Sequence, residues 1–513
     1  MLKVRILLVS TYELGHQPVH IASPAAALRM RGHDLRCLDL SVQKWDPTGV
    51  ELASWAEAAA FSVPMHTAMR LTLEVIPELR KYNPTMPVCV YGLYAGLAVA
   101  PYSRLETIYA VAGEYEPSLV QWAEALAAGE DPVAAVCQGQ RAGAGGQDQP
   151  RRESQLAGLR VDLRRHSQSD KMLPARDLLP PLQRYAKLLS KGTEQLAGYV
   201  EASTGCSHRC RHCPVPVIYD GRMRSAAVDN VLADIEQLVA MGAKHVSFGD
   251  PDFLNAPQHA LRVVRATHDA FPQLTFDATV KVEHVLRHET IWPEMSKAGC
   301  LFVVSAFEST DDEVLAKLAK GHTVSDAARA VEILREQGIE PRPSFVPFTP
   351  WTTRAQIEDL FEFVYRYDLV YNVDPVQYGI RLLVPPGSLL VTSGQLDGIV
   401  QSYDPDQLGY PWKSPDPWTD MLQVTLAKIA EEAAACEQPV EETFEEMVSQ
   451  VTKGRSTQEF AQPVKSPTAP FTPGQHRPRL SEAWFCCAEP TEAQHLSVAG
   501  RSASQCLAPG CST

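Results

Sequence analysis

The sequence predicts an α/β protein with a doubly wound amino-terminal sheet, a second series of strand–helix units that forms a parallel barrel, and a helical tail. First, short apolar runs alternate with amphipathic stretches up to about residue 390, as in parallel α/β folds. Second, Gly242, Gly299 and Gly338 each stand between a helical stretch and a strand-like run, where a left-handed helix cap is needed. Third, a glycine- and glutamine-rich stretch at 139–150 divides the two series.

Composition and charge limit the function classes. The 513 residues include 47 Lys and Arg against 61 Asp and Glu, a formal net charge of −14, which argues against a nucleic-acid or anionic-membrane partner. No segment approaches the roughly twenty apolar residues that span a bilayer, and the apolar run at the amino terminus is too short for a signal peptide. The 12 cysteines gather mainly at 206–213 and 486–511, which indicates metal or redox use in a reducing compartment. We therefore expect a cytoplasmic protein.

Residues 1–127 are predicted to form the doubly wound domain, because five strand-like runs alternate there with helical stretches. The first strand is Val4–Val9, and the first helix is expected to begin with Ser23 as N-cap and Pro24 at its first position. The other strand-like runs are Leu35–Leu40, Ala58–Val63, Val88–Tyr91 and Thr107–Ala110, and the helical stretches include His66–Lys81 and Pro117–Leu126. The ligand crevice of such a sheet lies at the carboxyl ends of its strands.

Glycines follow the fourth and fifth strands of this domain, in Gly92-Leu-Tyr-Ala-Gly96 and Gly113-Glu-Tyr-Glu-Pro117. Small residues stand where the backbone comes close to another group. That group is either a bound ligand or a neighbouring helix or domain. The second explanation has to be kept because glycine is also common in tight turns between strands and helices.

Residues 128–172 are predicted to be a flexible linker, because they lack an apolar period. Residues 173–400 are predicted to be the core domain, with about six strand–helix repeats. Its expected strands are Leu196–Ala202, His245–Phe248, Thr275–Val280 and Leu301–Ala306, and its expected helices include Val231–Leu238, Pro257–Ala270, Ala327–Leu334 and one that begins at the capping box Thr353–Gln356. In a parallel barrel, functional groups gather at the carboxyl ends of the strands.

Those strand ends carry cysteines and charged residues. They are Cys206, Cys210 and Cys213, then Asp250 and Asp252, then Lys281, Glu308, Arg342 and Arg381. Each aspartate is also suited to capping the helix that follows it, and each of the other charges has a structural alternative. Their shared position at one end of the predicted barrel favours a common site.

The three cysteines lie in Gly205-Cys-Ser-His-Arg-Cys-Arg-His-Cys-Pro214, with C-x3-C-x2-C spacing. Three thiolates so close together hold one metal centre, and a [4Fe-4S] cluster bound here would have one iron without a protein ligand. A structural zinc site is the alternative, but it needs a fourth ligand, for which His208 and His212 are the local candidates.

This motif resembles that of the radical S-adenosylmethionine (radical SAM) enzymes. The resemblance implies a partial six-unit (β/α)6 barrel, one [4Fe-4S] cluster held by Cys206, Cys210 and Cys213, and S-adenosyl-L-methionine bound to the open iron. It further implies reductive cleavage of that cofactor to start radical chemistry on a small-molecule substrate, with electrons from a flavodoxin- or ferredoxin-type donor. Asp250 or Asp252 would then meet the cofactor amino group and Glu308 its ribose or methionine end, with Lys281, Arg342 and Arg381 as partners of a carboxylate or an anionic substrate.

The amino-terminal domain resembles the cobalamin-binding domain that precedes the barrel in one large subset of these enzymes. Domains of that kind that replace the lower axial base carry D-x-H-x-x-G after the first strand. The corresponding stretch here is Ser10-Thr-Tyr-Glu-Leu-Gly15, in which only the glycine matches and Tyr12 stands at the histidine position. The resemblance therefore implies a cobalamin-binding-like domain, and cobalamin as a cofactor, without that histidine ligand.

The carboxyl-terminal part is predicted to be a helical extension at 401–455 followed by a mobile tail at 456–513. The tail contains Cys486-Cys487-Ala-Glu-Pro490, and the whole chain resembles the CUAEP/CCAEP-tail radical SAM proteins. Because some proteins of that family carry selenocysteine at the position matching Cys487 and others carry cysteine, the resemblance implies a catalytic role for Cys486 and Cys487. A redox pair, a soft-metal or metalloid site, and a thiol that reacts with an intermediate are the alternatives.

Taken together, these resemblances imply a radical SAM enzyme. The alternatives are a cobalamin-dependent radical methyltransferase, a methylthiotransferase-like enzyme, and a non-catalytic metal- or cobalamin-binding protein. A methylthiotransferase would need a second cluster in the amino-terminal domain, for which only Cys37, Cys89 and Cys137 are available.

Overall fold

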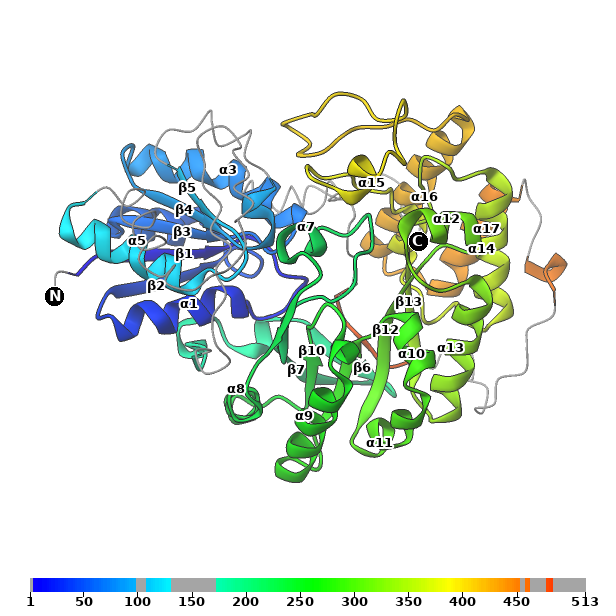
Figure 1. The fold of residues 1–513 in the computed structure, drawn as a ribbon, viewed down its shortest axis with the longest axis horizontal. Helices are drawn as coiled ribbons and strands as arrows, with labels where there is room; N and C mark the ends of the chain where they lie inside the picture. Colours follow the sequence, from blue (N-terminus) through cyan, green and yellow to red (C-terminus); the bar gives the residue numbers. More distant parts are fainter. Residues whose placement is uncertain (1–2, 98–107, 131–171, 453–456, 462–476, 483–513) are drawn as a thin grey trace, which may run out of the picture. The chain divides into compact units, whose positions relative to one another are not determined.

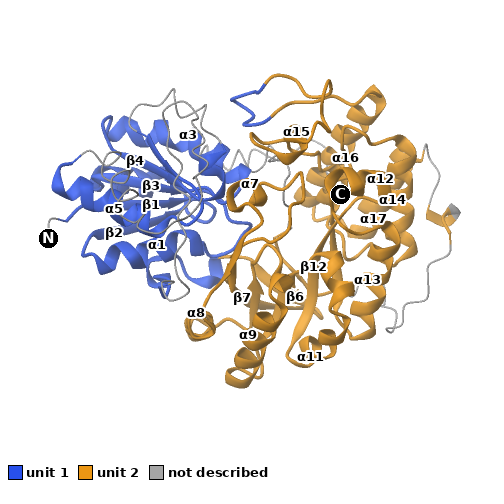
Figure 2. Cartoon of the chain, viewed as in Figure 1, with its two compact units in different colours: residues 1–184, 403–409, 490–501 blue, residues 185–402, 410–489, 502–513 orange. Residues whose placement is uncertain are grey.

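The computed structural model (Figure 1) describes residues 3–97, 108–130, 172–452, 457–461 and 477–482. These residues form two compact units (Figure 2), of which unit 1 contains residues up to 184 together with 403–409, and unit 2 contains the rest. The predicted fold class, a doubly wound sheet followed by a partial barrel and helices, is confirmed. The domain limits expected from the sequence stay a prediction.

Unit 1 is built on a five-stranded parallel sheet. Its strands are β1 (Arg5–Ser10), β2 (Asp34–Asp39), β3 (Ala58–Ser62), β4 (Val88–Tyr91) and β5 (Ile108–Val111), in the order β2-β1-β3-β4-β5. Helices α1 (Val19–Met30) and α5 (Glu116–Ala128) pack on one face of the sheet, and α2 (Val50–Trp55) and α3 (His66–Tyr82) lie together on the other. The strand order reverses between β1 and β3, and ligands bind beside such a switch point in doubly wound sheets.

Helix α1 differs from the sequence prediction, because it begins at Val19 and contains Pro24 in its interior. A proline there cannot donate to the carbonyl four residues earlier, which is that of His20. The Tyr91 hydroxyl donates to the His20 carbonyl oxygen instead, at 2.9 Å. Tyr91 of β4 thus gives the His20 carbonyl oxygen the hydrogen bond that Pro24 cannot give, and the helix continues through the proline.

Gly92 shows why a glycine follows the fourth strand. Its φ is +114°, and a Cβ at this position would lie 3.1 Å from the carbonyl oxygen of Val63. Of the two explanations that the sequence left open, close backbone packing within the sheet therefore accounts for Gly92.

Unit 2 contains a curled sheet of five parallel strands. They are β7 (Thr193–Val200), β10 (His245–Phe248), β11 (Thr275–Thr279), β12 (Cys300–Glu308) and β13 (Glu340–Phe345). Two short strands, β6 (Lys187–Ser190) and β14 (Arg479–Leu480), extend it beyond β7, giving the order β13-β12-β11-β10-β7-β6-β14. The connecting helices are α8 (Val228–Ala240), α9 (Pro257–Ala270), α10 (Val282–Arg287), α11 (Trp292–Lys297), α12 (Asp312–Leu318), α13 (Val324–Glu336) and α14 (Arg354–Arg366).

The sixth repeat of the barrel is short. After α14 the chain forms a 3₁₀ helix, η8 (Pro375–Gly379), and Arg381 then makes a single parallel bridge with Phe348. Helices α15 (Leu389–Thr392), α16 (Pro417–Ala435) and α17 (Val440–Val451) follow, and the last two pack on η8.

The remaining short elements lie mostly in loops. They are η1 (Trp45–Gly49), η2 (Leu93–Gly96), η4 (Arg176–Leu178), η5 (Leu182–Arg184), β8 (Ser203–Gly205), α7 (Val215–Tyr219), β9 (Met223–Ser225), η6 (Phe253–Asn255), η7 (Glu289–Ile291) and η9 (Thr457–Glu459). Within the described ranges, no helix is long and apolar enough to cross a membrane.

Candidate metal centre

The cysteine loop, residues 206–214, lies beyond the carboxyl end of β7, between β8 and α7. Strand β8 pairs with β9, and Gly205 closes this small hairpin with a φ of +80°. A Cβ at Gly205 would collide with the carbonyl oxygen of Arg222. Glycine is therefore required where the chain turns into the loop.

Two distant segments hold the cysteine loop in place through Arg211. Its backbone N–H donates to the Leu318 carbonyl oxygen at 2.9 Å, and its guanidinium donates to the Lys317 carbonyl oxygen at 3.0 Å. Both carbonyl groups belong to the last turn of helix α12, where carbonyl oxygens accept no hydrogen bond from the helix backbone. On the other side, the N–H of Leu390 donates to the Arg211 carbonyl oxygen at 3.2 Å. Hydrogen bonds to α12 and to Leu390 thus anchor the loop.

The cysteines themselves lie in a poorly solvated environment. Cys206 and Cys210 are buried and Cys213 is half-buried. Burial raises the pKa of Cys206 to about 11 and also raises that of Cys210. A bound metal centre favours the thiolate form through its positive charge, so this environment suits thiols that ionise on binding metal.

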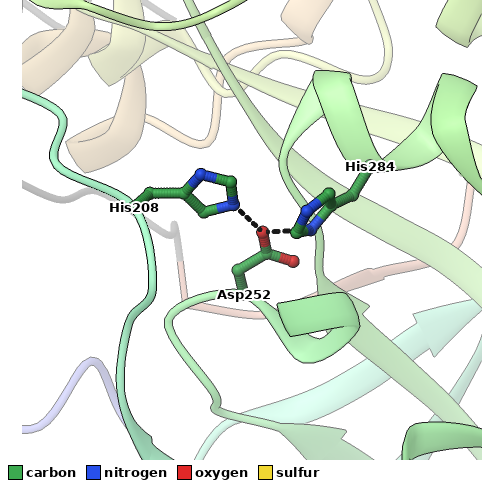
Figure 3. A group of neighbouring side chains, drawn as sticks. All are labelled: His208, Asp252 and His284. Carbon is green, nitrogen blue, oxygen red and sulfur yellow. Dashed lines mark hydrogen bonds and ion pairs between the residues drawn. The ribbon is translucent and has the colours of Figure 1, made fainter. Parts of the chain in front are cut away.

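Both histidines of the loop are engaged with carboxylates. His208 Nε2 lies 3.2 Å from Asp252 Oδ2, and His284 Nδ1 approaches the same oxygen at 2.7 Å (Figure 3). The Lys281 ammonium lies 3.2 Å from His208 Nδ1, so both ring nitrogens of His208 have a polar neighbour. Burial alone would raise the pKa of Asp252, but the two histidines hold it below its ordinary value.

A second buried group also lies near the cysteines, because Lys320 interacts electrostatically with Cys210 and Cys213. His212 Nε2 and Lys320 Nζ lie 3.0 Å and 3.1 Å from Glu308 Oε1. Although burial opposes ionisation, Lys320 and His212 hold the pKa of Glu308 well below its ordinary range. Glu308 has a φ of +65°, which turns the end of β12 toward this group.

These contacts argue against structural zinc. Within the described part of the chain, only His208, Asp252 and His284 form a trio of potential ligands whose atoms all lie within 4.8 Å of one another. Thiolates on a single zinc ion would lie about 3.8 Å apart, given zinc–sulfur bonds of about 2.3 Å, and the three cysteines form no such trio.

The predicted charged residues divide into two groups. Asp250 and Asp252 lie beside the cysteine loop, and Asp250 accepts hydrogen bonds from Ala202 N at 3.0 Å and from the Ser203 hydroxyl. Asp252 also caps η6 by accepting from Leu254 N. Lys281 and Glu308 likewise lie at the loop, and Lys281 forms an ion pair with Glu283 at 3.0 Å.

Arg342 and Arg381 are held elsewhere in unit 2. Arg342 pairs with Asp374 at 2.9 Å, and Arg381 pairs with Asp420 at 2.8 Å while lying over the Trp412 ring. Roles for these predicted residues in binding a cofactor or substrate stay predictions. Cys486 and Cys487 lie outside the described residues.

Two residues that contact the loop escaped sequence reasoning. Asn255 Nδ2 lies 3.4 Å from Cys206 Sγ, while its Oδ1 accepts from the Ser207 hydroxyl at 2.5 Å. Lys320 is buried beside Glu308. Asn255 follows the Asp250–Asp252 turn closely, and Lys320 precedes Gly321, but neither feature distinguishes them from ordinary loop residues.

Comparison with known proteins shows which proteins resemble the domain that contains the cysteine loop. Residues 200–364 match the profile of the radical SAM superfamily. The chain is 24% identical over 369 residues to hopanoid C-3 methylase from Methylococcus capsulatus, covering 70% of this chain and 66% of that protein. It is 25% identical over 200 residues to an uncharacterized methyltransferase from Pyrococcus horikoshii, covering 39% of this chain and 42% of the relative. The matches thus span between about two fifths and just under two thirds of these relatives.

Solved structures share the fold at low sequence identity. The radical S-adenosylmethionine methyltransferase TsrM from Kitasatospora setae, with tryptophan and a SAM analogue bound, has a TM-score of 0.61 and 18% identity over 83% of this chain and 89% of its own. The cobalamin-dependent S-adenosylmethionine radical enzyme OxsB, with aqua-cobalamin bound, has a TM-score of 0.62 and 13% identity over 84% and 67%. Residues 200–364 of the chain therefore carry a radical SAM superfamily domain.

Proposed function

We propose that this enzyme reductively cleaves S-adenosylmethionine at a [4Fe-4S] cluster and directs the radical to a small-molecule substrate, with cobalamin held in unit 1. The observation that carries the proposal is the position of the cysteine loop at the carboxyl ends of the barrel strands, where Arg211 is held from both sides. Its two histidines are paired with carboxylates, which leaves Cys206, Cys210 and Cys213 as the ligands.

The groups around the loop suit a zwitterionic cofactor. When bound, the cluster supplies the electron that cleaves S-adenosylmethionine into methionine and a 5′-deoxyadenosyl radical. Lys281 and Glu283 present opposite charges beside the loop, and the buried Glu308 and Asp252 are held ionised. Amino and carboxylate groups of the cofactor would find complementary charges here.

Unit 1 supports the cobalamin part of the proposal. Ser10 ends β1, and Thr67 lies in the first turn of α3, which follows β3. Both hydroxyls are buried, and neither has a hydrogen-bond partner in the described structure. Unsatisfied buried hydroxyls are uncommon, and their position on either side of the switch point suits a ligand with polar groups. OxsB and TsrM, which share the fold, have been solved with cobalamin bound.

A second cluster in unit 1, which a methylthiotransferase would need, is not favoured. Cys37 lies in β2 and Cys89 in β4, so β1 and β3 separate them and their strands are about 14 Å apart. Burial raises the pKa of Cys37 to about 12. The third cysteine of that interpretation, Cys137, lies outside the described residues. Cobalamin-dependent methyl transfer is therefore the stronger proposal for the reaction class.

The test is anaerobic reconstitution with iron and sulfide, followed by reduction in the presence of S-adenosylmethionine and chromatographic detection of 5′-deoxyadenosine. We expect product from wild type and from Cys300→Ala, which removes a buried cysteine outside the loop. Cys210→Ala should lose both cluster absorbance and product. If wild type bearing an intact cluster makes no product with candidate substrates present, the chain is a binding protein instead. Reduction by a flavodoxin or a ferredoxin would identify the donor.

Cobalamin binding is measured separately, by adding cobalamin to the protein and recording its absorbance after gel filtration. Replacing the two orphan hydroxyls in Ser10→Ala and Thr67→Val should weaken retention, while Ser54→Ala, whose hydroxyl bonds within α2, serves as the matched control. Wild type that retains no cobalamin would restrict the proposal to radical chemistry without methyl transfer.

A further inference from the structure

Two histidines and an aspartate, which we call the histidine trio, meet beside the cysteine loop and include none of its three cysteines. His208 belongs to the loop, Asp252 to the turn after β10, and His284 to α10, which follows β11. The trio therefore joins the carboxyl ends of β7, β10 and β11, which are neighbours in the sheet. Figure 3 shows both rings beside the same oxygen of the Asp252 carboxylate.

The distances within the histidine trio suit ligands of one metal ion. Asp252 Oδ2 lies 3.2 Å from His208 Nε2 and 2.7 Å from His284 Nδ1, and all three atoms lie within 4.8 Å of one another. Two ligands of a tetrahedral zinc ion lie about 3.3 Å apart when each bond is about 2.0–2.1 Å long. Small side-chain movements would therefore bring the three atoms onto one ion. Two imidazoles with one carboxylate are also a ligand set that zinc uses.

The orientation of His284 is a second, independent observation. Its side chain is buried, and its Nδ1 makes no hydrogen bond in the described structure, although Asp252 Oδ2 lies 2.7 Å away as an ion-pair contact. The oxygen therefore lies off the direction in which this nitrogen hydrogen-bonds. Ligands of one ion have this relation, because each points at the ion rather than at the other. Buried polar atoms without a hydrogen bond are uncommon, and a bound ion would satisfy this one.

Neighbouring residues hold the trio through atoms other than the three that face one another. Asp252 Oδ1 accepts from Leu254 N at 3.1 Å, while Oδ2 faces the histidines. His208 Nδ1 lies 3.2 Å from Lys281 Nζ and 4.0 Å from Glu283 Oε2. When Nε2 binds an ion, Nδ1 carries the proton, and Glu283 is the nearby acceptor. The Lys281 ammonium opposes a nearby cation, but its charge is offset by Glu283 at 3.0 Å.

From these contacts we propose that His208 Nε2, Asp252 Oδ2 and His284 Nδ1 bind one divalent transition-metal ion of the zinc type, separate from the cluster. Three protein ligands leave one position of a tetrahedral ion for water or for an oxygen atom of a small molecule. The ion also ties the cysteine loop to the ends of β10 and β11. Because Asp252 then binds the ion, Glu308 remains for the amino group of S-adenosylmethionine. Only this last point rests on the proposed function.

Zinc X-ray absorption tests the site in the full-length, cluster-loaded protein. Accessible thiols are alkylated after cluster loading, loosely bound iron is removed with a chelator, and Zn²⁺ is added before gel filtration. We expect one retained zinc ion per chain, with imidazole nitrogen and carboxylate oxygen at about 2.0–2.1 Å and no sulfur at about 2.3 Å. Sulfur neighbours would assign the zinc to cysteines and overturn the proposal. Wild type that retains no zinc would overturn it as well.

Variants of the trio identify the ligands. Asp252→Asn and His284→Ala should each weaken zinc binding at least about a hundredfold, because even changes beside a metal ligand cost 10–100-fold in affinity. His288→Ala is the matched control and should bind zinc as wild type does, since its ring lies 5.4 Å from that of His284 but outside the trio. Folded trio variants with wild-type zinc affinity would refute the assignment. If a variant does not fold by circular dichroism, the wild-type zinc spectrum decides.

Iron content separates this proposal from the proposed function. A chain that takes up no cluster contradicts the proposed function but leaves the histidine trio untouched. The zinc titration is then repeated on a protein that carries Cys206→Ser, Cys210→Ser and Cys213→Ser together. Zinc bound by nitrogen and oxygen in that protein would support the site, and zinc that is not retained would overturn it.

Discussion

Lys320 donates to the buried carboxylate of Glu308 at 3.1 Å. His212, the residue before Cys213, contacts the same carboxylate oxygen. One ion pair thereby links the end of β12 to the segment that carries the metal ligands. It also places a buried positive charge close enough to interact electrostatically with Cys210 and Cys213.

Replacing Lys320 should show how much its ion pair with Glu308 contributes to the stability of the protein. In Lys320→Met the Glu308 carboxylate loses its main compensating charge, and we expect the free energy of unfolding of the apoprotein to fall by about 3–5 kcal/mol. Urea denaturation measures the loss. The double variant Lys320→Met with Glu308→Gln should recover most of it, because no unpaired charge remains. A double variant as unstable as the single one would show that packing, rather than charge, explains the effect.

Asn255 should tune the reduction potential of a cluster held by Cys206. Its amide donates to Cys206 Sγ at 3.4 Å, and hydrogen bonds to cluster sulfurs raise the potential. We expect the potential to fall in Asn255→Ala and to fall further in Asn255→Asp, which places a negative charge at the sulfur. A redox titration followed by electron paramagnetic resonance measures the order, with iron content as the control for loading. Equal potentials in all three proteins would contradict this role.

His322 should make stability depend on pH. Burial, followed by the charge of Lys320, lowers its pKa to about 4, and its Nε2 donates to the Phe307 carbonyl oxygen at 3.3 Å. The unfolded chain binds a proton near pH 6.5, so below that pH the unfolded state gains protons that the folded state does not. The contribution of neutral His322 to the free energy of unfolding is fully present above about pH 6.5. It falls by about 3 kcal/mol as the pH drops to about 4.

Denaturant unfolding between pH 4 and 7 measures this dependence. His322→Gln keeps a donor for Phe307 but cannot be protonated, and it should flatten the slope across the window. His268→Gln, which replaces a histidine at the end of α9, is the matched control. An unchanged slope in the His322 variant would assign the pH dependence to other groups.

Tyr91 and Pro24 should be energetically coupled in unit 1. Tyr91→Phe leaves the His20 carbonyl without its donor, and a lost buried hydrogen bond should cost about 1–3 kcal/mol. Adding Pro24→Ala returns an N–H that can donate to His20 within α1, so the double variant should recover stability. Thermal unfolding of the four proteins gives the coupling energy. Additive losses would indicate that α1 does not use the returned donor.

Local patterns were sufficient to predict most of the framework. The cysteine spacing, the capping boxes and the apolar runs lie within a few residues of one another, and the elements that they predict are present, such as α14 with the capping box formed by Thr353 and Gln356. Pro24 is the counterexample, because the group that makes it tolerable, the Tyr91 hydroxyl, lies far along the chain.

The candidate site could be predicted only in outline. Strand ends located Asp252, Lys281 and Glu308, but not their partners, because His284 and Lys320 reach the site through side-chain geometry that spacing does not encode. Arg342 and Arg381 were expected at strand ends as well, but Arg342 lies inside β13 and Arg381 follows η8, and they are paired with Asp374 and Asp420.

The cysteine loop is synthesised before the two segments that anchor Arg211. Its partners, Leu318 and Leu390, are made well after the cysteines. At about 5–20 residues per second, the ribosome needs on the order of ten seconds or more to pass from Cys213 to Leu390. The nascent cysteines therefore leave the ribosome before their scaffold exists, and the loop reaches its anchored shape only when both segments have emerged.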